Sequence, residues 1–350
     1  MVRGFSKTAM VAGMVLAYCS AAQAQVNMVY VTVGDPGNIG ELSGGGAGGY
    51  GPDRICGAVD YTYKIGICEV TNGQYRAFLN AKAAVGDPYG LYDTAMNNMW
   101  AGIDRSGSGI VGDPYVYTAK GGDSAWDVRP VNYVSWHDTV RFANWMTNGQ
   151  GSGDTESGSY VIAGGGVDSG AVTVPTAAER AAWTTPRVVL PSEDEWYKAA
   201  YYKGGGTNAG YWLYATQSDT VPTSEAPPGT DSVNGSANYY DGDYAVGAPY
   251  YTAAVGAYTD KPSTSAYGTF DQNGNVWERT EAFDGSDRQL RGASFYMNEV
   301  SSLRASHRIF NSAWSSNIGF RVAEVPEPAT VGLLGMGVCV LLRRRAKYRR

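Results

Sequence analysis

Three stretches of the chain begin with a polar residue and continue with apolar residues at helical spacing. Thr71, Ser135 and Ser192 each stand three residues before a Gln, Asp or Glu, which is the pattern of a helix N-cap and its reciprocal partner. The apolar residues that follow are Tyr75, Phe78 and Leu79; Val140, Phe142, Ala143, Trp145 and Met146; and Trp196, Ala199 and Ala200. The pattern predicts three helices that begin beside these capping residues.

Short apolar or alternating runs predict the strands, which are fewer than the loops between them. The runs lie at residues 28–33, 59–68, 188–190, 288–295 and 320–322. Glycine-rich stretches at 44–51, 149–153, 164–170 and 204–206 are predicted to be surface loops. The pattern indicates an α+β domain with small sheets, few helices and extensive irregular loops.

Charge is distributed unevenly along the 350 residues. The chain carries 27 basic and 33 acidic residues, but eight of the basic ones lie within the first 7 or the last 8 positions. The rest of the chain therefore has a net charge of about −14, which excludes a nucleic-acid partner because such proteins cluster Lys and Arg. Hydrophobic residues make up 43%, with 26 Tyr and 9 Trp, so a disordered chain is excluded as well.

The first 24 residues have the order of a secretory signal peptide. Arg3 and Lys7 precede an apolar run at 9–18, and small residues flank Gln23. We expect signal peptidase to cleave after Ala24, which leaves residues 25–324 as the exported domain.

Residues 325–350 form a second predicted targeting segment. Pro326-Glu327-Pro328 is followed by the apolar stretch 329–342 and then by Arg343-Arg344-Arg345. As a helix, those 14 apolar residues would rise only ~21 Å, less than the ~30 Å hydrocarbon core of a bilayer. The segment resembles the PEP-CTERM sorting signal. The resemblance implies processing by an exosortase and a place on the bacterial cell surface or in the extracellular matrix; the alternative is a marginal C-terminal membrane anchor.

Two cysteines, Cys56 and Cys68, lie outside these end segments. An oxidising compartment permits a disulfide between them, although the sequence does not place their Cβ atoms together.

Six short motifs follow one another in a recognisable order. They are residues 69–75, 130–136, 190–196, 274–278, 291–294 and 319–322, which include Thr71-Asn72-Gly73-Gln74-Tyr75, Gly274-Asn275-Val276-Trp277-Glu278 and Gly319-Phe320-Arg321-Val322. Together they resemble the formylglycine-generating enzyme, or sulfatase-modifying factor, domain from about Met28 to Ala323. The resemblance implies a single domain with a C-type-lectin-like α+β fold.

The catalytic chemistry of that family is not expected in this chain. The resemblance implies oxygen-dependent catalysis on two copper-binding cysteines shortly after a Gly-Gly-Ser motif, here Gly292-Ala293-Ser294. Residues 294–304 contain no cysteine, and copper(I) requires soft thiolate ligands. A related iron enzyme uses three histidines, whereas this chain has only His137 and His307. We therefore assign no catalytic residue and expect no copper.

The resemblance implies a structural Ca²⁺ site instead. Its ligands would be the carbonyls of Asn273, Gly274 and Val276 and the side chain of Glu278, with Asp271 as a further acid. Oxygen ligands of this kind suit calcium. The alternative is an ordinary Asp/Asn/Gly turn.

A second family calcium site would begin at Asn238 and the carbonyl of Tyr239. Its aspartate partner should fall near 247–249, where the chain has none, although Asp241 or Asp243 could replace it. This second site is therefore doubtful.

Trp277, Ser294, Arg304 and Arg308 lie on the segments that surround the family's active site, and we take them as candidates for lining a ligand-binding groove. Structural ion pairing is the alternative for the two arginines. These features favour a non-catalytic binding module, with extracellular polysaccharide as its expected ligand. The alternatives are a divergent metal-dependent oxidase of the same family and a purely architectural surface protein.

Overall fold

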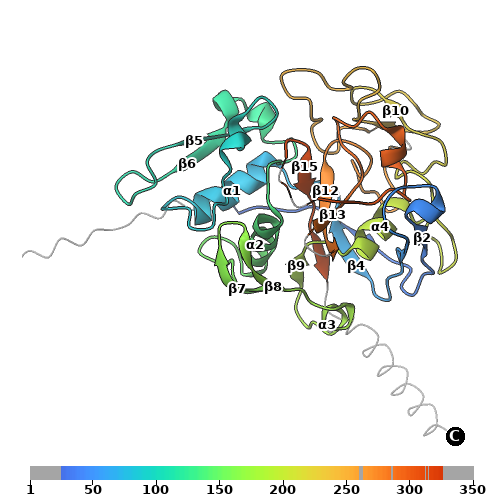
Figure 1. Cartoon of the computed structure of the whole chain (residues 1–350), viewed down its shortest axis with the longest axis horizontal. Coiled ribbons are helices and arrows are strands. Elements are labelled where there is room, and N and C mark those ends of the chain that lie inside the picture. The colour runs from blue at the N-terminus through green and yellow to red at the C-terminus, as the bar shows by residue number, and fades with distance from the viewer. Residues whose placement is uncertain (1–24, 260–262, 285–286, 312, 314, 326–350) are drawn as a thin grey trace, which may run out of the picture.

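The computed structural model describes residues 25–259, 263–284, 287–311, 313 and 315–325 (Figure 1). Its α-helices are α1 (Asn72–Lys82), α2 (Trp136–Thr147), α3 (Ala177–Ala181) and α4 (Glu193–Tyr201). Each begins at a complete capping box, at Thr71, Ser135, Thr176 and Ser192 respectively. The three predicted helices are confirmed. α3 was not predicted, because five residues are too few to show a helical period.

One sheet joins the two ends of the domain. Its four strands, in spatial order, are β1 (Tyr30–Val33), β4 (Tyr63–Gly66), β16 (Ala323–Val325) and β9 (Arg187–Val189). All neighbouring pairs are antiparallel. Val325 pairs with Arg187, so the folded domain extends one residue beyond the predicted boundary at 324.

A second sheet contains the predicted site residues Trp277 and Glu278. Its strands, in spatial order, are β14 (Ile309–Phe310), β13 (Asp287–Arg291), β12 (Trp277–Asp284) and β15 (Ile318–Phe320). β12 and β15 run parallel, while the other neighbours are antiparallel. The sequence did not predict β12, because its Glu278, Arg279 and Glu281 are charged and yet buried.

Smaller elements fill the rest of the chain. Two-stranded pairs are β2 (Glu41–Ser43) with β3 (Arg54–Cys56), β5 (Ile103–Ser106) with β6 (Val116–Ala119), β7 (Val161–Gly166) with β8 (Ser169–Thr173), and β10 (Thr223–Ser224) with β11 (Ser236–Ala237). Short 3₁₀ turns lie at Gly45–Ala47, Thr94–Asn97, Lys120–Gly122, Ser124–Trp126 and Val300–Leu303. The loop predicted at 164–170 is therefore wrong: it belongs to the β7–β8 hairpin, whose tight turn takes Asp168 to φ 46°.

Aromatic packing holds α1 and α2 to the second sheet. Phe78 of α1 meets Trp145 and Phe142 of α2 at ring centroid distances of 5.1 and 5.5 Å, and Phe142 meets Phe320 at 5.4 Å. Each such pair adds about 0.5–1.5 kcal/mol beyond the burial of apolar area. Residues from α1, α2 and both sheets thus share one core.

The predicted signal peptide lies outside the described residues, and so does the sorting segment from residue 326 to residue 350. Within the described part of the chain, no helix combines the length and the hydropathy needed to cross a bilayer.

Candidate functional site

Residues 292–304 follow β13 and include the short turn at 300–303. The family resemblance implies two cysteines in this segment. Ala293 is held at φ 68°, and the Phe295 N–H donates to the Asn275 carbonyl at 2.9 Å. The side chain of Asn317 donates to Ser294 Oγ at 3.1 Å. Met297 packs against a buried cluster that includes Trp277. The segment is therefore fixed by ordinary packing and hydrogen bonds.

Three of the four predicted groove residues are interior residues. Trp277, Ser294 and Arg308 are at most 4% exposed, so they do not line an open groove. Arg304 is partly exposed, and its Nε lies 3.4 Å from the hydroxyl of Tyr214. For Arg308 the structural alternative, buried ion pairing, is the one that the structure shows.

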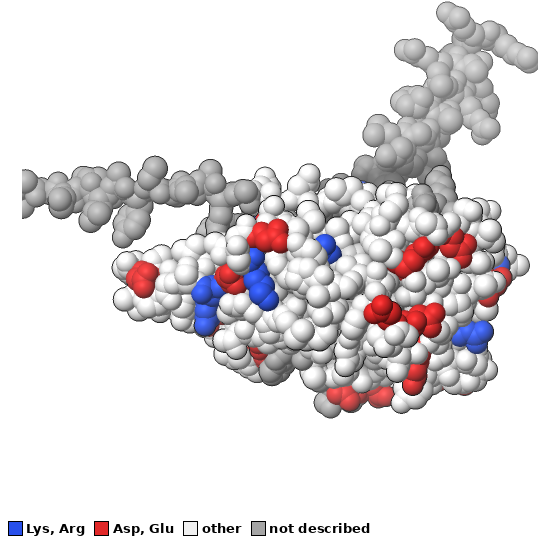
Figure 2. Space-filling view, turned by 90° about the horizontal axis from the view of Figure 1, so that it is seen from above, with Lys and Arg blue, Asp and Glu red and all other residues white. Residues whose placement is uncertain are grey.

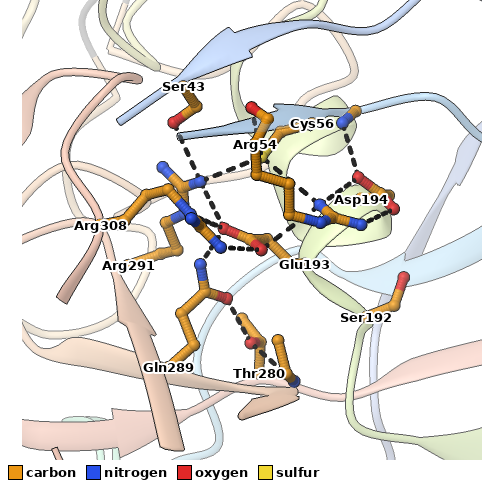
Figure 3. Close-up of polar contacts among 12 residues, drawn as sticks. Ser43, Arg54, Cys56, Ser192, Glu193, Asp194, Thr280, Gln289, Arg291 and Arg308 are labelled. Carbon is orange, nitrogen blue, oxygen red and sulfur yellow. Dashed lines mark hydrogen bonds and ion pairs between the residues drawn. The ribbon is translucent and has the colours of Figure 1, made fainter. Parts of the chain in front are cut away.

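Arg308 belongs to a buried network centred on Glu193, the first residue of α4 (Figure 3). Arg308 donates to both Glu193 oxygens at 2.7 and 2.8 Å, and Arg291 of β13 donates to one of them at 2.5 Å. Arg54 of β3 approaches at 3.3 Å, and Gln289 also donates to Glu193. The network ties α4 to both β3 and the second sheet.

These arginines control the charge of Glu193. Burial alone would raise the pKa of this carboxyl, but Arg291, Arg308 and Arg54 outweigh burial and lower the pKa to about 2. Glu193 is therefore ionised at every physiological pH, and its ion pairs with the arginines persist over that whole range.

A second buried network contains more carboxylates than guanidinium groups. Arg180 of α3 pairs with Glu195 at 2.7 Å and also with Glu281 of β12. One guanidinium faces two carboxylates, so one negative charge stays uncompensated. Burial, with the Glu195 charge as a lesser cause and Arg180 opposing both, raises the pKa of Glu281 to about 7.

The side chains predicted to bind calcium do not form a cation site. Both oxygens of Glu278 are engaged: Arg321 donates to them at 2.5 and 2.6 Å, and the Trp196 indole donates at 2.8 Å. Asp271 Oδ2 accepts from the Gly256 N–H at 2.7 Å, and the Asn273 side chain bonds to the backbone. No group of three or more His, Cys, Asp or Glu among the described residues could hold a metal ion. The side chains of this donor set are thus bonded to other protein groups, and we derive no function from it.

The two residues predicted to begin the doubtful second calcium site also bond to other protein groups. The Tyr239 carbonyl accepts from Ser224 Oγ at 2.5 Å, and the Asn238 side chain donates to the Tyr251 carbonyl and to Asn275. Asn238 is buried and supports a loop, while Asp241 and Asp243 are exposed to solvent.

The structure shows no disulfide between Cys56 and Cys68, which are both free thiols. Cys56 lies in the Glu193 network, where Arg54 and Arg291 donate to its sulfur at 3.4 Å. Cys68 lies beside Asp271, and burial raises the pKa of both thiols. Cys56 is the last residue of β3, whereas Cys68 follows β4, and the two belong to different polar environments.

Both histidines are held by contacts with the protein. His137 is half-buried, and its Nε2 lies 3.1 Å from the Gly170 carbonyl. His307 is 7% exposed and is stacked on Tyr50, with ring centroids 5.4 Å apart.

A surface feature that the sequence did not reveal lies next to Ser294. We define the aromatic patch as Trp100, Tyr240, Tyr244, Tyr251 and Tyr296, all at least partly exposed. Their rings contact one another: Trp100 lies 4.3 Å from Tyr251 and 6.0 Å from Tyr296, and Tyr244 lies 4.9 Å from Tyr251 and 5.1 Å from Tyr240. Patches of this kind on a protein surface mark interaction sites.

Hydrogen bonds fix the backbone beneath the patch. The Tyr240 N–H donates to the Met297 carbonyl at 3.2 Å, and the Asn132 side chain donates to the Trp100 carbonyl at 2.7 Å. Buried Phe295 forms the floor, 5.8 Å from the ring of Trp100. Three separate loops are thereby joined before any ligand arrives. The only sequence signal was the density of tyrosine between 239 and 251.

Figure 2 shows one face on which acidic and basic side chains stand singly or in small groups, while most of the area carries neither. A ligand on this face would meet few charged side chains.

A family model of the sulfatase-modifying factor enzyme 1-like domain matches residues 55–325. The chain belongs to this family. Its fold is accordingly the C-type-lectin-like α+β fold predicted from the motifs. A model of the PEP-CTERM protein-sorting motif matches residues 324–346, which marks the chain for export, exosortase processing and the cell surface.

Solved structures of similar fold are distant in sequence. CarF is 21% identical, over 86% of this chain and 99% of that one, with a TM-score of 0.47. Treponema denticola variable protein 1 is 18% identical, over 87% and 98%, with a TM-score of 0.48. PvdO from Pseudomonas aeruginosa is 17% identical, over 85% and 92%, with a TM-score of 0.43. No curated protein matches the sequence.

Proposed function

We propose that this exported member of the family is a binding module for extracellular polysaccharide and not an oxidase. The observation that carries the proposal is the aromatic patch, which adjoins the segment where the family resemblance implies the cysteine pair. The faces of sugar rings present polarised C–H groups, which pack on the negative faces of aromatic rings. Tyrosine hydroxyls at the same surface can bond the sugar hydroxyls.

The geometry of the patch supports this ligand class. Tyr296 is 56% exposed, so its ring is accessible, and the neighbouring rings are preordered by the contacts described above. Little conformational entropy remains to be lost on binding, which favours affinity for a flexible polymer.

Affinity electrophoresis tests the proposal. The exported protein should be retarded in a gel that contains the extracellular polysaccharide of the producing bacterium. Tyr244→Ala with Tyr296→Ala should abolish most of the retardation. Phe283→Ala is the matched control, because Phe283 is also exposed but lies at the other end of β12 from Trp277. Unretarded wild-type protein, or oxygen uptake with a cysteine-containing peptide and copper, would overturn the proposal.

A further inference from the structure

A pocket of about 270 Å³ adjoins the aromatic patch. It is lined by Met99, Lys120, Trp126, Ala248, Pro249 and Tyr251. Tyr251 belongs to both features, and Met99 directly precedes Trp100 of the patch. The pocket and the patch are therefore two parts of one continuous surface that meet at the ring of Tyr251.

The pocket has the composition of a sugar subsite. Its walls are largely apolar, and the partly exposed ring of Tyr251 is available for stacking. Lys120 supplies the polar group: its ammonium lies 5.6 Å from the Trp126 ring centroid and donates one hydrogen bond to the Asn98 carbonyl. An ammonium has three donors, so two stay available for ligand hydroxyls.

The neighbouring framework is rigid. The Tyr250 hydroxyl donates to Asp123 at 2.6 Å, and the Arg129 guanidinium stacks 3.8 Å from the Tyr250 ring centroid. Tyr250 also packs edge-on against Trp126, with centroids 5.0 Å apart. These contacts fix the wall of the pocket independently of the patch.

The surrounding charges select against an anionic polymer. Asp104, Asp123, Asp241 and Asp243 outnumber the two cations, Lys120 and Arg129, along the pocket and the patch. Arg129 is already engaged with Tyr250 and with the Thr252 carbonyl. A polyanion would meet a net repulsion along this path, whereas a neutral chain would not.

We propose that the pocket is a second subsite, so that the protein binds a neutral polysaccharide chain across pocket and patch together rather than a single sugar. This inference rests on the proposed function and adds the ligand's charge and minimum length. Two linked subsites make the second contact effectively intramolecular, so affinity should rise steeply with chain length.

The test uses the producing bacterium's extracellular polysaccharide, partly hydrolysed and separated into neutral and anionic fractions of about two and about six units. Calorimetry with the exported protein should show the six-unit neutral fraction binding at least about tenfold more tightly than the two-unit fraction. Met99→Glu, at a residue that is 56% exposed, should remove this gain. Val111→Glu, at a residue that is 80% exposed and outside the pocket, is the control.

Equal affinity for both lengths, tighter binding of the anionic fraction, or an unchanged length dependence in Met99→Glu would overturn the two-subsite inference while leaving the binding function intact. Absence of binding to every fraction would overturn the inference and the proposed function together.

Discussion

Glu193 is the residue on which the largest buried charge network depends, because Arg291, Arg308 and Arg54 all pair with it. Replacing it by glutamine leaves the charges of Arg291 and Arg308 uncompensated in the interior, whereas Arg54 keeps its pair with Asp194. We expect Glu193→Gln to lower the free energy of unfolding by about 3–5 kcal/mol. Urea denaturation followed by circular dichroism measures the change.

The control for this variant is Glu324→Gln, which removes an ion pair at the surface. Glu324 pairs with Lys64 at 2.7 Å, but the Lys64 side chain is 43% exposed. The expected loss is therefore below about 1 kcal/mol. Equal losses in the two variants would contradict the central role given to Glu193.

Glu281 gives the stability a pH dependence. Its folded pKa is raised to about 7 from an ordinary 4.5, so the folded state retains a proton that the unfolded state releases. The folded state therefore gains from this group at low pH, and the gain is lost as the pH rises from about 4.5 through 7. We expect Tm to fall over that interval, and to fall less in Glu281→Gln. A steeper fall in the variant would show that the sign is wrong.

At the scale of residues, the sequence identified the segments of the site but not their exposure. Trp277 and Arg308 were expected in a groove and are buried instead. Exposure depends on which distant segments cover a residue, and Arg308 is covered because its charge is matched by Glu193, 115 positions earlier. Sequence spacing does not encode such a match.

Among the elements, α4 matters most for the network, because its capping residue directly precedes Glu193. Ser192 accepts from the Glu195 N–H, and Glu195 accepts from the Ser192 N–H. We expect Ser192→Ala to cost at least about 1 kcal/mol of unfolding free energy, since it removes the cap and loosens the start of α4.

Thr176→Ala is the comparison for this element. Thr176 forms the same capping box on α3, which has five residues and an exposed start. A smaller loss is expected here, to be measured by thermal unfolding of both variants. A larger loss in Thr176→Ala would contradict the importance assigned to α4.

The helices α1, α2 and α4 were predictable because a capping box, complete within four residues, is followed in each by apolar residues at helical spacing. The box of α3 has no such run after it. β12 was missed because its signal is not local: Glu278 is paired with Arg321, and Arg279 donates to the carbonyls of Val134 and Ala313. A charged stretch becomes a buried strand only when such partners arrive from elsewhere in the chain.

For the whole molecule, the structure predicts that calcium does not contribute to stability. Arg321 already neutralises Glu278, so a bound cation would have to displace it. The Tm of the exported protein should be the same in 1 mM calcium and in EDTA, to within about 1 °C. A rise of several degrees in calcium would indicate binding to the folded state and would restore the site that the sequence motif implied.

The family and the sorting motif could be predicted from the sequence, because each is marked by short motifs that follow one another along the chain. The aromatic patch was not, since its rings come from three loops, around residues 100, 240–251 and 296. Their approach is set by backbone bonds such as the one from Tyr240 to Met297. The binding surface is thus a property of the fold.

Calorimetric titration of the exported protein with the producing bacterium's extracellular polysaccharide tests the central claim most directly. The account predicts saturable binding by the wild-type protein and at least about tenfold weaker binding by Tyr244→Ala with Tyr296→Ala, because two stacking contacts are lost. The variant should remain folded, with the circular dichroism spectrum of the wild type. Equal affinity of wild type and variant, or no heat of binding in either, would contradict the account.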